Sequence, residues 1–247
     1  MKPVKQQNIK LVIEYDGTDF SGWQRLPAKR TVQGTIESVL TNILNTPTTL
    51  TGAGRTDAGV HAYGQTANFM LKNEFDLVKL RRALNGLLPE DIAIREISKV
   101  KPGFSSRFDA KMKTYTYVVL NSSIPSALQA RYSYFYPRVL KVSMIKKAAK
   151  GLLGRHDFKH FSSGEEREKT VRSVKAIKIT KKGNYISMDF TGRSFLRRMV
   201  RIMAGLLVDA GAGAIRPADT GKIVRGKMKF SPKALPPRGL FLKEIKY

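Results

Sequence analysis

Apolar and polar residues alternate in the first part of the chain with the periods of both strands and helices. The helix period is clearest at six apolar positions: Val32, Ile36, Val39, Leu40, Ile43 and Leu44. The predicted order is strand, helix, strand, strand, helix, strand, over residues 9–15, 32–44, 48–52, 65–71, 77–88 and 92–100.

The same order of elements returns in the rest of the chain. Its predicted strands and helices cover residues 112–120, 143–153, 171–180, 185–190, 195–210 and 240–245. Two copies of a split β-α-β unit predict an α+β protein, pseudo-duplicated into two ferredoxin-like halves with antiparallel sheets and helices on one face. We expect an N-terminal half over residues 1–105 and a C-terminal half over residues 106–247. The duplication rests on element order alone, and a single large α+β domain is the alternative.

Composition narrows the class of protein. The chain has 247 residues, of which 42% are hydrophobic and 26% charged, as in globular proteins. Its longest apolar stretch, residues 203–215, is interrupted by Asp209 and is too short for a membrane span, and the N-terminus lacks a signal-peptide core. The chain has no cysteine, which excludes disulfides, iron–sulfur clusters and a cysteine nucleophile. We therefore expect a cytoplasmic protein with no membrane partner.

Charge points to a polyanionic partner. The chain has 45 Lys and Arg against 19 Asp and Glu, a formal net charge of +26. Residues 1–123 have 17 basic and 11 acidic side chains, and residues 124–247 have 28 and 8. Nucleic acid is the partner class that such a field favours, and the second half supplies most of the field.

A glycine-rich loop at residues 51–62, TGAGRTDAGVHA, is the clearest motif. Its small residues let backbone approach a ligand closely. No Lys-Ser or Lys-Thr follows the glycines and no G-x-G-x-x-G is present, so nucleotide cofactors are not expected. Taken alone, the loop also fits a tight turn in which Thr56 or Asp57 caps a short helix.

The string GRTDAGVHA at residues 54–62 resembles the active-site motif of the tRNA pseudouridine synthase A family. Further blocks resemble the family in the same order: YDGT at 15–18, GWQ at 22–24, TVQG at 31–34, KTYTY at 113–117, FLRRMVR at 195–201 and PPRGL at 236–240. The likeness runs from about residue 9 to the C-terminus. The chain departs from the family at Ser105 and Ser106, where a histidine and a small residue are common, and at Leu26, where a glutamine is common. These departures concern substrate contacts.

The resemblance implies isomerisation of uridine to pseudouridine at positions 38, 39 and 40 of the anticodon stem-loop of tRNA. In this reaction the N-glycosidic bond breaks, the uracil turns, and C5 bonds to C1′ of the same ribose. An aspartate can act as the nucleophile, and no metal, small-molecule cofactor or energy source is needed. The resemblance assigns this role to Asp57, with attack at C1′ or at C6 left open. It also implies a homodimer in which both subunits contact one tRNA.

Three further residues receive roles from the resemblance. Arg201 is expected to keep Asp57 ionised, although it could be one more solvated charge. Arg55 is expected to fill the space of the flipped base or to bind a phosphate. Tyr115 is expected to stack on the uracil, with an aromatic position in the sheet core as the alternative. The roles of Tyr117, Trp23 and Arg107 stay open.

Other functions fit the sequence less well. His156 and His160 have the spacing of a zinc helix, but Asp157 replaces the expected glutamate and no third ligand is evident. A metal-dependent nuclease needs clustered acidic ligands, and the acidic residues are scattered. A non-catalytic basic RNA-binding or ribosome-associated protein accounts for the charge, but it has no use for the Arg55-Thr56-Asp57 string.

Overall fold

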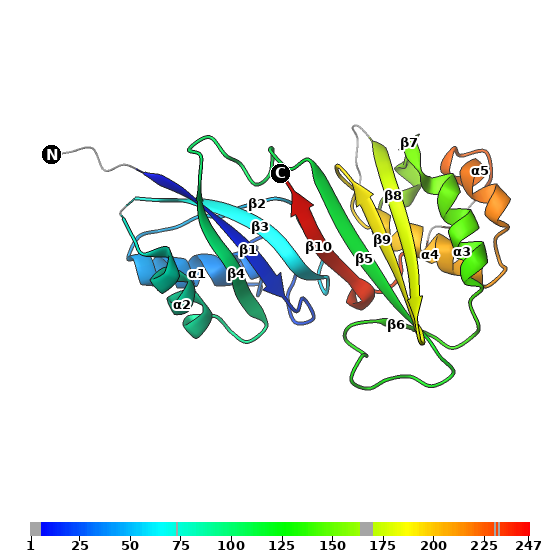
Figure 1. Ribbon diagram of the computed structural model, residues 1–247, viewed down its shortest axis with the longest axis horizontal. Coiled ribbons are helices and arrows are strands. Elements are labelled where there is room, and N and C mark those ends of the chain that lie inside the picture. Colours follow the sequence, from blue (N-terminus) through cyan, green and yellow to red (C-terminus); the bar gives the residue numbers. More distant parts are fainter. Residues whose placement is uncertain (1–5, 73, 164–169, 230, 232) are drawn as a thin grey trace. The chain divides into compact units, whose positions relative to one another are not determined.

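The structure, a computed structural model, describes residues 6–72, 74–163, 170–229, 231 and 233–247. The chain folds into two compact units, which are visible in Figure 1: unit 1 comprises residues 1–111 and 242–247, and unit 2 comprises residues 112–241. The predicted division lies between residues 105 and 106. The C-terminal residues belong to unit 1 because the Lys111 N–H donates to the Lys246 carbonyl (2.8 Å) and the Tyr247 hydroxyl donates to the Ser106 carbonyl (3.0 Å).

Unit 1 is built on an antiparallel sheet. Its elements are β1 Gln7–Tyr15, α1 Val32–Leu44, β2 Thr51–Gly52, β3 His61–Leu71, α2 Leu77–Leu87, β4 Ile92–Val100 and most of β10 Leu240–Lys246. The strand order is β4-β1-β3-β10, with β2 beside β3, and β1 is antiparallel to both β3 and β4. Helices α1 and α2 contact each other, and α2 also contacts β4.

The core of unit 1 follows the predicted periodicity. Alternate residues of β1 are fully buried, namely Ile9, Leu11 and Ile13. They are joined by buried residues of the two helices: Val32, Ile36, Leu40, Leu80 and Leu84. Thr31 begins α1 as its N-cap, since its side chain accepts a hydrogen bond from the Gly34 N–H.

The second predicted strand is shorter than expected, and the third is longer. Residues 48–50 are not in a strand because the side chains of α1 bind the backbone of Leu50 instead: the Leu50 N–H donates to Glu37 Oε1 (2.8 Å), and Gln33 Nε2 donates to the Leu50 carbonyl (3.1 Å). Strand β3 begins at His61, four residues before the predicted start. Both boundaries depend on contacts between segments that are distant in the sequence.

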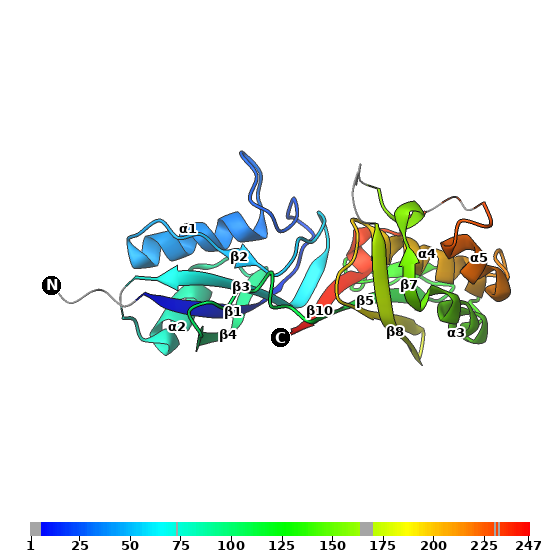
Figure 2. The same ribbon diagram turned by 90° about the horizontal axis from the view of Figure 1, so that it is seen from above.

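Unit 2 also has a largely antiparallel sheet covered by helices. Its elements are β5 Met112–Asn121, β6 Tyr134–Tyr136, α3 Val142–Ala149, β7 Gly154–Asp157, β8 Val171–Lys182, β9 Tyr185–Gly192, α4 Met199–Gly211 and α5 Thr220–Val224, with short 3₁₀ turns between them. The strand order is β5-β9-β8-β7, and β6 runs parallel beside β5. Helices α3, α4 and α5 lie on the same side of strands β5, β9 and β8 (Figure 2).

Two features of unit 2 differ from the sequence prediction. Helix α4 begins at Met199 instead of Phe195 because Arg198 has a left-handed backbone (φ 63°), which a helix cannot continue through. His156 lies in β7 and His160 in a 3₁₀ turn, so the two residues do not share a helix face, in line with the weak case for a zinc helix in the sequence. The strands β6 and β7 and the helix α5 were not predicted, and all three are short.

The described part of the chain lacks two kinds of feature. None of its helices is both long enough and apolar enough to cross a bilayer. Nor do its His, Asp and Glu side chains form a group of three or more that could hold a metal ion.

Candidate functional site

The loop between β2 and β3 carries two of the predicted site residues. Within it, Arg55 is exposed, Thr56 is buried and Asp57 is half-buried. The burial of Thr56 anchors the loop and leaves the side chains on either side of it accessible. A half-buried carboxylate on an anchored loop is suited to act on a bound substrate as a nucleophile or as a base.

Thr56 is held by two contacts, one from the end of β1 and one from the loop that follows β1. Its Oγ1 lies 2.8 Å from the hydroxyl of Tyr15, the last residue of β1, and its carbonyl accepts a hydrogen bond from the Trp23 N–H (3.2 Å). Burial raises the pKa of the Tyr15 hydroxyl well above its usual range, so Tyr15 stays neutral and keeps its hydrogen bond. Both the side chain and the carbonyl of Thr56, the residue before Asp57, are therefore held in place.

The start of the loop is tied to β3, and its end is closed by a turn within the loop. The Ala53 N–H donates to the Thr66 carbonyl (2.8 Å), and Gln65 Nε2 donates to the Gly54 carbonyl (2.9 Å). After the carboxylate, the Val60 N–H donates to the Asp57 carbonyl (3.2 Å) and closes a turn. Gly59 has a φ of 74° in this turn, a conformation that glycine adopts without strain.

Two glycines let the loop of residues 16–23 approach the Asp57 loop closely. A Cβ on Gly17 would lie 2.0 Å from the Val60 carbonyl oxygen, and a Cβ on Gly22 would lie 2.8 Å from the Thr56 carbonyl oxygen. Gly22 also has a φ of 95°. Any larger residue at either position would push the two loops apart.

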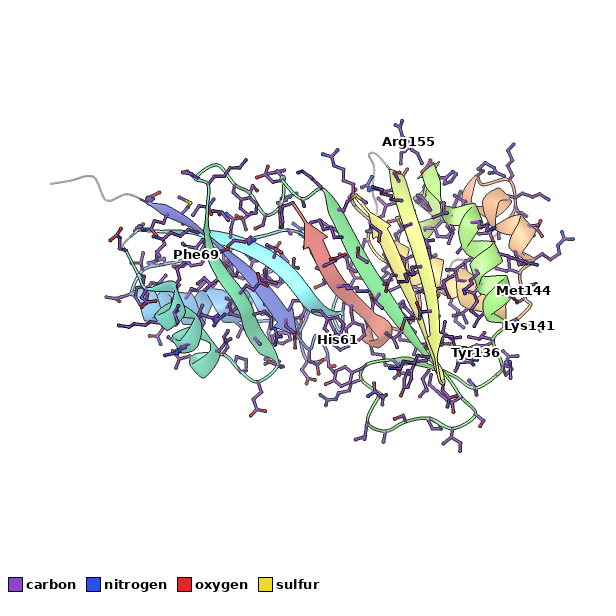
Figure 3. The ribbon with its side chains drawn as sticks, in the orientation of Figure 1. His61, Phe69, Tyr136, Lys141, Met144 and Arg155 are labelled. Carbon is purple, nitrogen blue, oxygen red and sulfur yellow. The ribbon has the colours of Figure 1, made fainter. Side chains whose placement is uncertain are left out.

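His61 joins the same two loops from the start of β3 (Figure 3). Its side chain is 2% exposed, and its Nδ1 lies 3.0 Å from Asp16 Oδ1 and 3.1 Å from the Gly17 nitrogen. Asp16, Tyr15 and His61 had no predicted role of their own. Polar residues close to glycines were the available signal in the sequence, but their partners are more than 40 residues away.

Tyr115, the predicted base-contacting residue, lies in β5 of unit 2. It stands opposite Phe190 of β9, and its residue exposure is 9%. Its ring meets the ring of Phe195 edge to face, with centroids 5.5 Å apart and an interplanar angle of 87°. This contact fixes the plane of the Tyr115 ring.

Arg201 lies in α4 of unit 2 and is half-buried. Its Nε donates to the Leu235 carbonyl (2.6 Å), and the Leu235 N–H donates to the Arg201 carbonyl (3.3 Å). Its positive charge also acts on buried Tyr117: burial raises the pKa of that hydroxyl, and Arg201 partly opposes the rise. The guanidinium is therefore anchored and only partly solvated.

The structure locates the three residues whose roles were open. Tyr117 is fully buried, and its hydroxyl donates to the Pro236 carbonyl (2.8 Å), so it braces the core of unit 2. Trp23 is 2% exposed and packs in unit 1, with its ring centroid 6.2 Å from that of Tyr15. Arg107 lies on the surface with its guanidinium 5.4 Å from the Phe108 ring centroid.

The predicted site residues are shared between the two units. Asp57 and Arg55 belong to unit 1, whereas Tyr115 and Arg201 belong to unit 2. Unit 1 has 18 basic and 12 acidic side chains, and unit 2 has 27 and 7. The carboxylate therefore sits in the less basic unit, and most of the positive charge is in the other.

Comparison with known proteins gives a consistent result. The family model described as tRNA pseudouridine synthase matches residues 11–109 and 148–247. The tRNA pseudouridine synthase A of Caldicellulosiruptor bescii is 40% identical over 243 residues, which is 98% of this chain and 100% of that protein. The Acetivibrio thermocellus protein of the same name is 38% identical over 98% of this chain and 100% of its own length. A solved Cbf5-Nop10-Gar1 complex aligns at 15% identity with a TM-score of 0.34, over 81% of this chain and 54% of that one; this likeness is too low to bear on the fold.

The packing of the two loops predicts a large difference between two Gly→Ala variants of unit 1. Gly17→Ala places a methyl group against the Val60 carbonyl and should lower the free energy of unfolding by about 2 kcal/mol or more. Gly103→Ala is the matched control because its Cβ meets nothing within 4 Å, and its effect should stay within about 0.5 kcal/mol. Urea unfolding followed by circular dichroism measures both. Equal stability of the two variants would contradict the close approach of the loops.

Proposed function

Because the chain belongs to the tRNA pseudouridine synthase family, whose members isomerise uridine to pseudouridine in tRNA, we propose that Asp57 is its catalytic nucleophile. The anchored, half-buried position of Asp57 is the observation that carries this proposal. The reaction conserves the atoms of the nucleotide: the bond from C1′ to N1 breaks, and a bond from C1′ to C5 replaces it. N1 gains a proton, and C5 loses its hydrogen to solvent.

The fixed backbone around Asp57 supports a role in covalent catalysis. A nucleophile gains most when its position is set before the substrate arrives, since no ordering is then needed at the reaction step. Thr56 and the turn closed by Val60 set that position from both sides. Attack at C1′ of the ribose and attack at C6 of the base both require one carboxylate oxygen of Asp57 to reach a nucleotide that has left the stack.

We assign the two candidate cations different tasks. A carboxylate that loses water on binding RNA needs a cation to remain charged, and Arg201 suits this task because its Nε is anchored on the Leu235 carbonyl. Arg55 is exposed two residues before Asp57, which suits insertion into the space that the flipped base leaves.

Tyr115 is assigned to the uracil. Its ring is already oriented by Phe195, so stacking on a base requires no reordering of the side chain. Stacking would also bring its hydroxyl close enough to C5 to take part in proton transfer.

Substrate site, assembly and location are also part of the proposal. The resemblance implies uridines 38, 39 and 40 of the anticodon stem-loop, bound by a homodimer in which both copies contact one tRNA. The charge of unit 2 supports binding of the RNA backbone over a wide surface. A chain without cysteine suits the reducing cytoplasm. A non-catalytic RNA-binding protein is the weaker alternative, since it leaves the anchored carboxylate without a purpose.

We also propose that the two units are copies of one split β-α-β arrangement, that is, two ferredoxin-like halves. In unit 1, β1 pairs with β3, and β3 pairs with β2. In unit 2, β5 pairs with β9, and β9 pairs with β8. Strands β5, β9 and β8 therefore correspond to β1, β3 and β2. The family model matches two separate stretches, one in each half of the sequence. Both observations support a duplication, with the nucleophile loop retained in the first half and the basic charge concentrated in the second.

The nucleophile assignment predicts the behaviour of Asp57→Asn. The amide keeps the shape of the side chain but cannot attack carbon, so turnover should fall below about one per cent of the original. Affinity for tRNA should stay within about threefold, because the anchoring contacts are unchanged. Release of tritium from tRNA labelled at uridine C5 measures turnover, and filter binding measures affinity.

Glu74→Gln is the control for this substitution because Glu74 is an exposed carboxylate in the same unit and lies outside the two loops around Asp57. It should retain most of the activity. If Asp57→Asn kept more than a few per cent of turnover in preparations free of other synthases, Asp57 would lose the nucleophile role.

The role of Arg201 predicts a difference between two of its variants. Arg201→Lys keeps the positive charge but has a carbon in place of the Nε that donates to the Leu235 carbonyl, whereas Arg201→Gln removes the charge and keeps an N–H donor at that position. Turnover at saturating tRNA should fall by about 100-fold or more in Arg201→Gln and by clearly less in Arg201→Lys. A decrease of turnover in Arg201→Gln that is no larger than in Arg201→Lys would show that the hydrogen bond matters more than the charge, and would reduce Arg201 to a structural brace of Leu235.

A further inference from the structure

A pocket of about 550 Å³ opens between α2 and β4 of unit 1. Three arginines line it: Arg81 and Arg82 from the helix, and Arg95 from the strand. None of its lining residues, all of which belong to the described part of the chain, is acidic. Outside the lining, Glu14 Oε2 lies 3.6 Å from Arg95 Nε and offsets part of the positive charge.

The walls of this pocket are held together by polar contacts. Asn85 bridges helix and strand, since the Ile94 N–H donates to its Oδ1 (2.7 Å) and its Nδ2 donates to the Ile94 carbonyl (3.1 Å). Arg81 Nη1 donates to the Arg95 carbonyl (3.3 Å). The helix is also anchored by Leu80 and Leu84, which are fully buried. The pocket is therefore formed before any ligand binds.

The chemistry of the lining selects an anion with several acceptor oxygens. A guanidinium group matches the oxygens of a phosphate with two parallel hydrogen bonds, and three such groups in one pocket disfavour a neutral ligand. At Gly86 the pocket is open to solvent, because an added Cβ would meet nothing within 4 Å. A phosphate that is part of a long chain can enter such an open site without being enclosed.

We propose that this arginine pocket binds a backbone phosphate of the tRNA, at a nucleotide other than the one that reacts. The proposal rests on the proposed function only for the identity of the RNA. It adds a positioning role for unit 1, which is otherwise much less basic than unit 2. Release of condensed counterions from the bound phosphate supplies the binding free energy.

The sheet of unit 1 links this pocket to the Asp57 loop. Ile92, at the start of β4, pairs with Tyr15 of β1, and the Tyr15 hydroxyl contacts Thr56. The pocket and the Asp57 loop are thus both attached to the strand pair β1–β4, close to the position where Tyr15 pairs with Ile92. A phosphate held in the pocket therefore fixes the orientation of the RNA relative to Asp57.

The test compares two double variants that remove the same charge from unit 1. Arg81→Gln with Arg82→Gln neutralises the pocket, and Lys72→Gln with Lys79→Gln neutralises two exposed lysines that do not line it. The pocket variant should weaken tRNA binding about tenfold or more at low salt, and it should reduce the salt slope by about 1 for each phosphate that the pocket no longer binds. It should raise KM much more than it lowers kcat. The lysine variant should change each quantity far less.

A second arm distinguishes an RNA phosphate from free phosphate. Sodium phosphate replaces sodium chloride at constant ionic strength, and tRNA affinity is measured for the parent protein and for the pocket variant. Phosphate should compete with tRNA in the parent more than in the variant. Binding of inorganic phosphate to the pocket, with equal tRNA affinity in both proteins, would overturn the proposal in favour of a small-anion site.

The remaining outcomes are also decisive. Equal decreases of tRNA affinity in the two double variants would reduce the pocket to general surface charge and overturn the proposal. Thermal unfolding shows whether the pocket variant has a folding defect. If it has one, Arg82→Gln is used alone, because the hydrogen bond from this pair of arginines to the strand comes from Arg81. If the parent protein bound tRNA through the pocket but released no tritium, the proposed function would fail while the pocket stood.

Discussion

The hydrogen bond between the buried hydroxyls of Tyr15 and Thr56 is the constraint on which the candidate site depends. The Tyr15 hydroxyl also has Gln65 as a hydrogen-bond partner, whereas removing that hydroxyl deprives the buried Thr56 side chain of its Tyr15 partner, which costs about 1–3 kcal/mol. The bond fastens the end of β1 to the loop of Asp57, so the carboxylate takes its position from the sheet. Arg30 holds the loop of residues 16–23 in a similar way. Both its terminal nitrogens contact Asp91 (2.8 and 2.9 Å), and its guanidinium lies 4.0 Å from the Phe20 ring centroid.

Hydrophobic periodicity was sufficient to predict the elements that form the two cores. Two elements have the predicted boundaries: the helix over residues 32–44 and the strand over residues 92–100. Each of them buries apolar residues at the spacing on which its prediction rested. The errors occur where a polar or conformational contact decides the outcome. Glu37 and Gln33 take the backbone of Leu50 out of the sheet, and the left-handed Arg198 delays the start of α4. Such contacts join positions that no local pattern connects.

The candidate site shows the same division between local and long-range information. The string around Asp57 could be found in the sequence because its glycines and carboxylate are adjacent, and the resemblance added Arg55, Arg201 and Tyr115. The supports of that string, Tyr15, Asp16 and His61, became visible only in the fold. The charge could be counted from the sequence, but the arginine pocket could not, because α2 and β4 must pack before Arg81 and Arg95 face one cavity.

A double-mutant cycle on Tyr15 and Thr56 tests most directly whether this hydrogen bond positions the nucleophile. Turnover at saturating tRNA, followed by tritium release from uridine C5, is measured for Tyr15→Phe, Thr56→Val and the double variant. If the two hydroxyls act as one unit, turnover of the double variant should be about the same as that of the worse single variant, since the single change has already removed their contact. Decreases that multiply would show that the two residues act independently, and would contradict the account of a loop positioned by their contact.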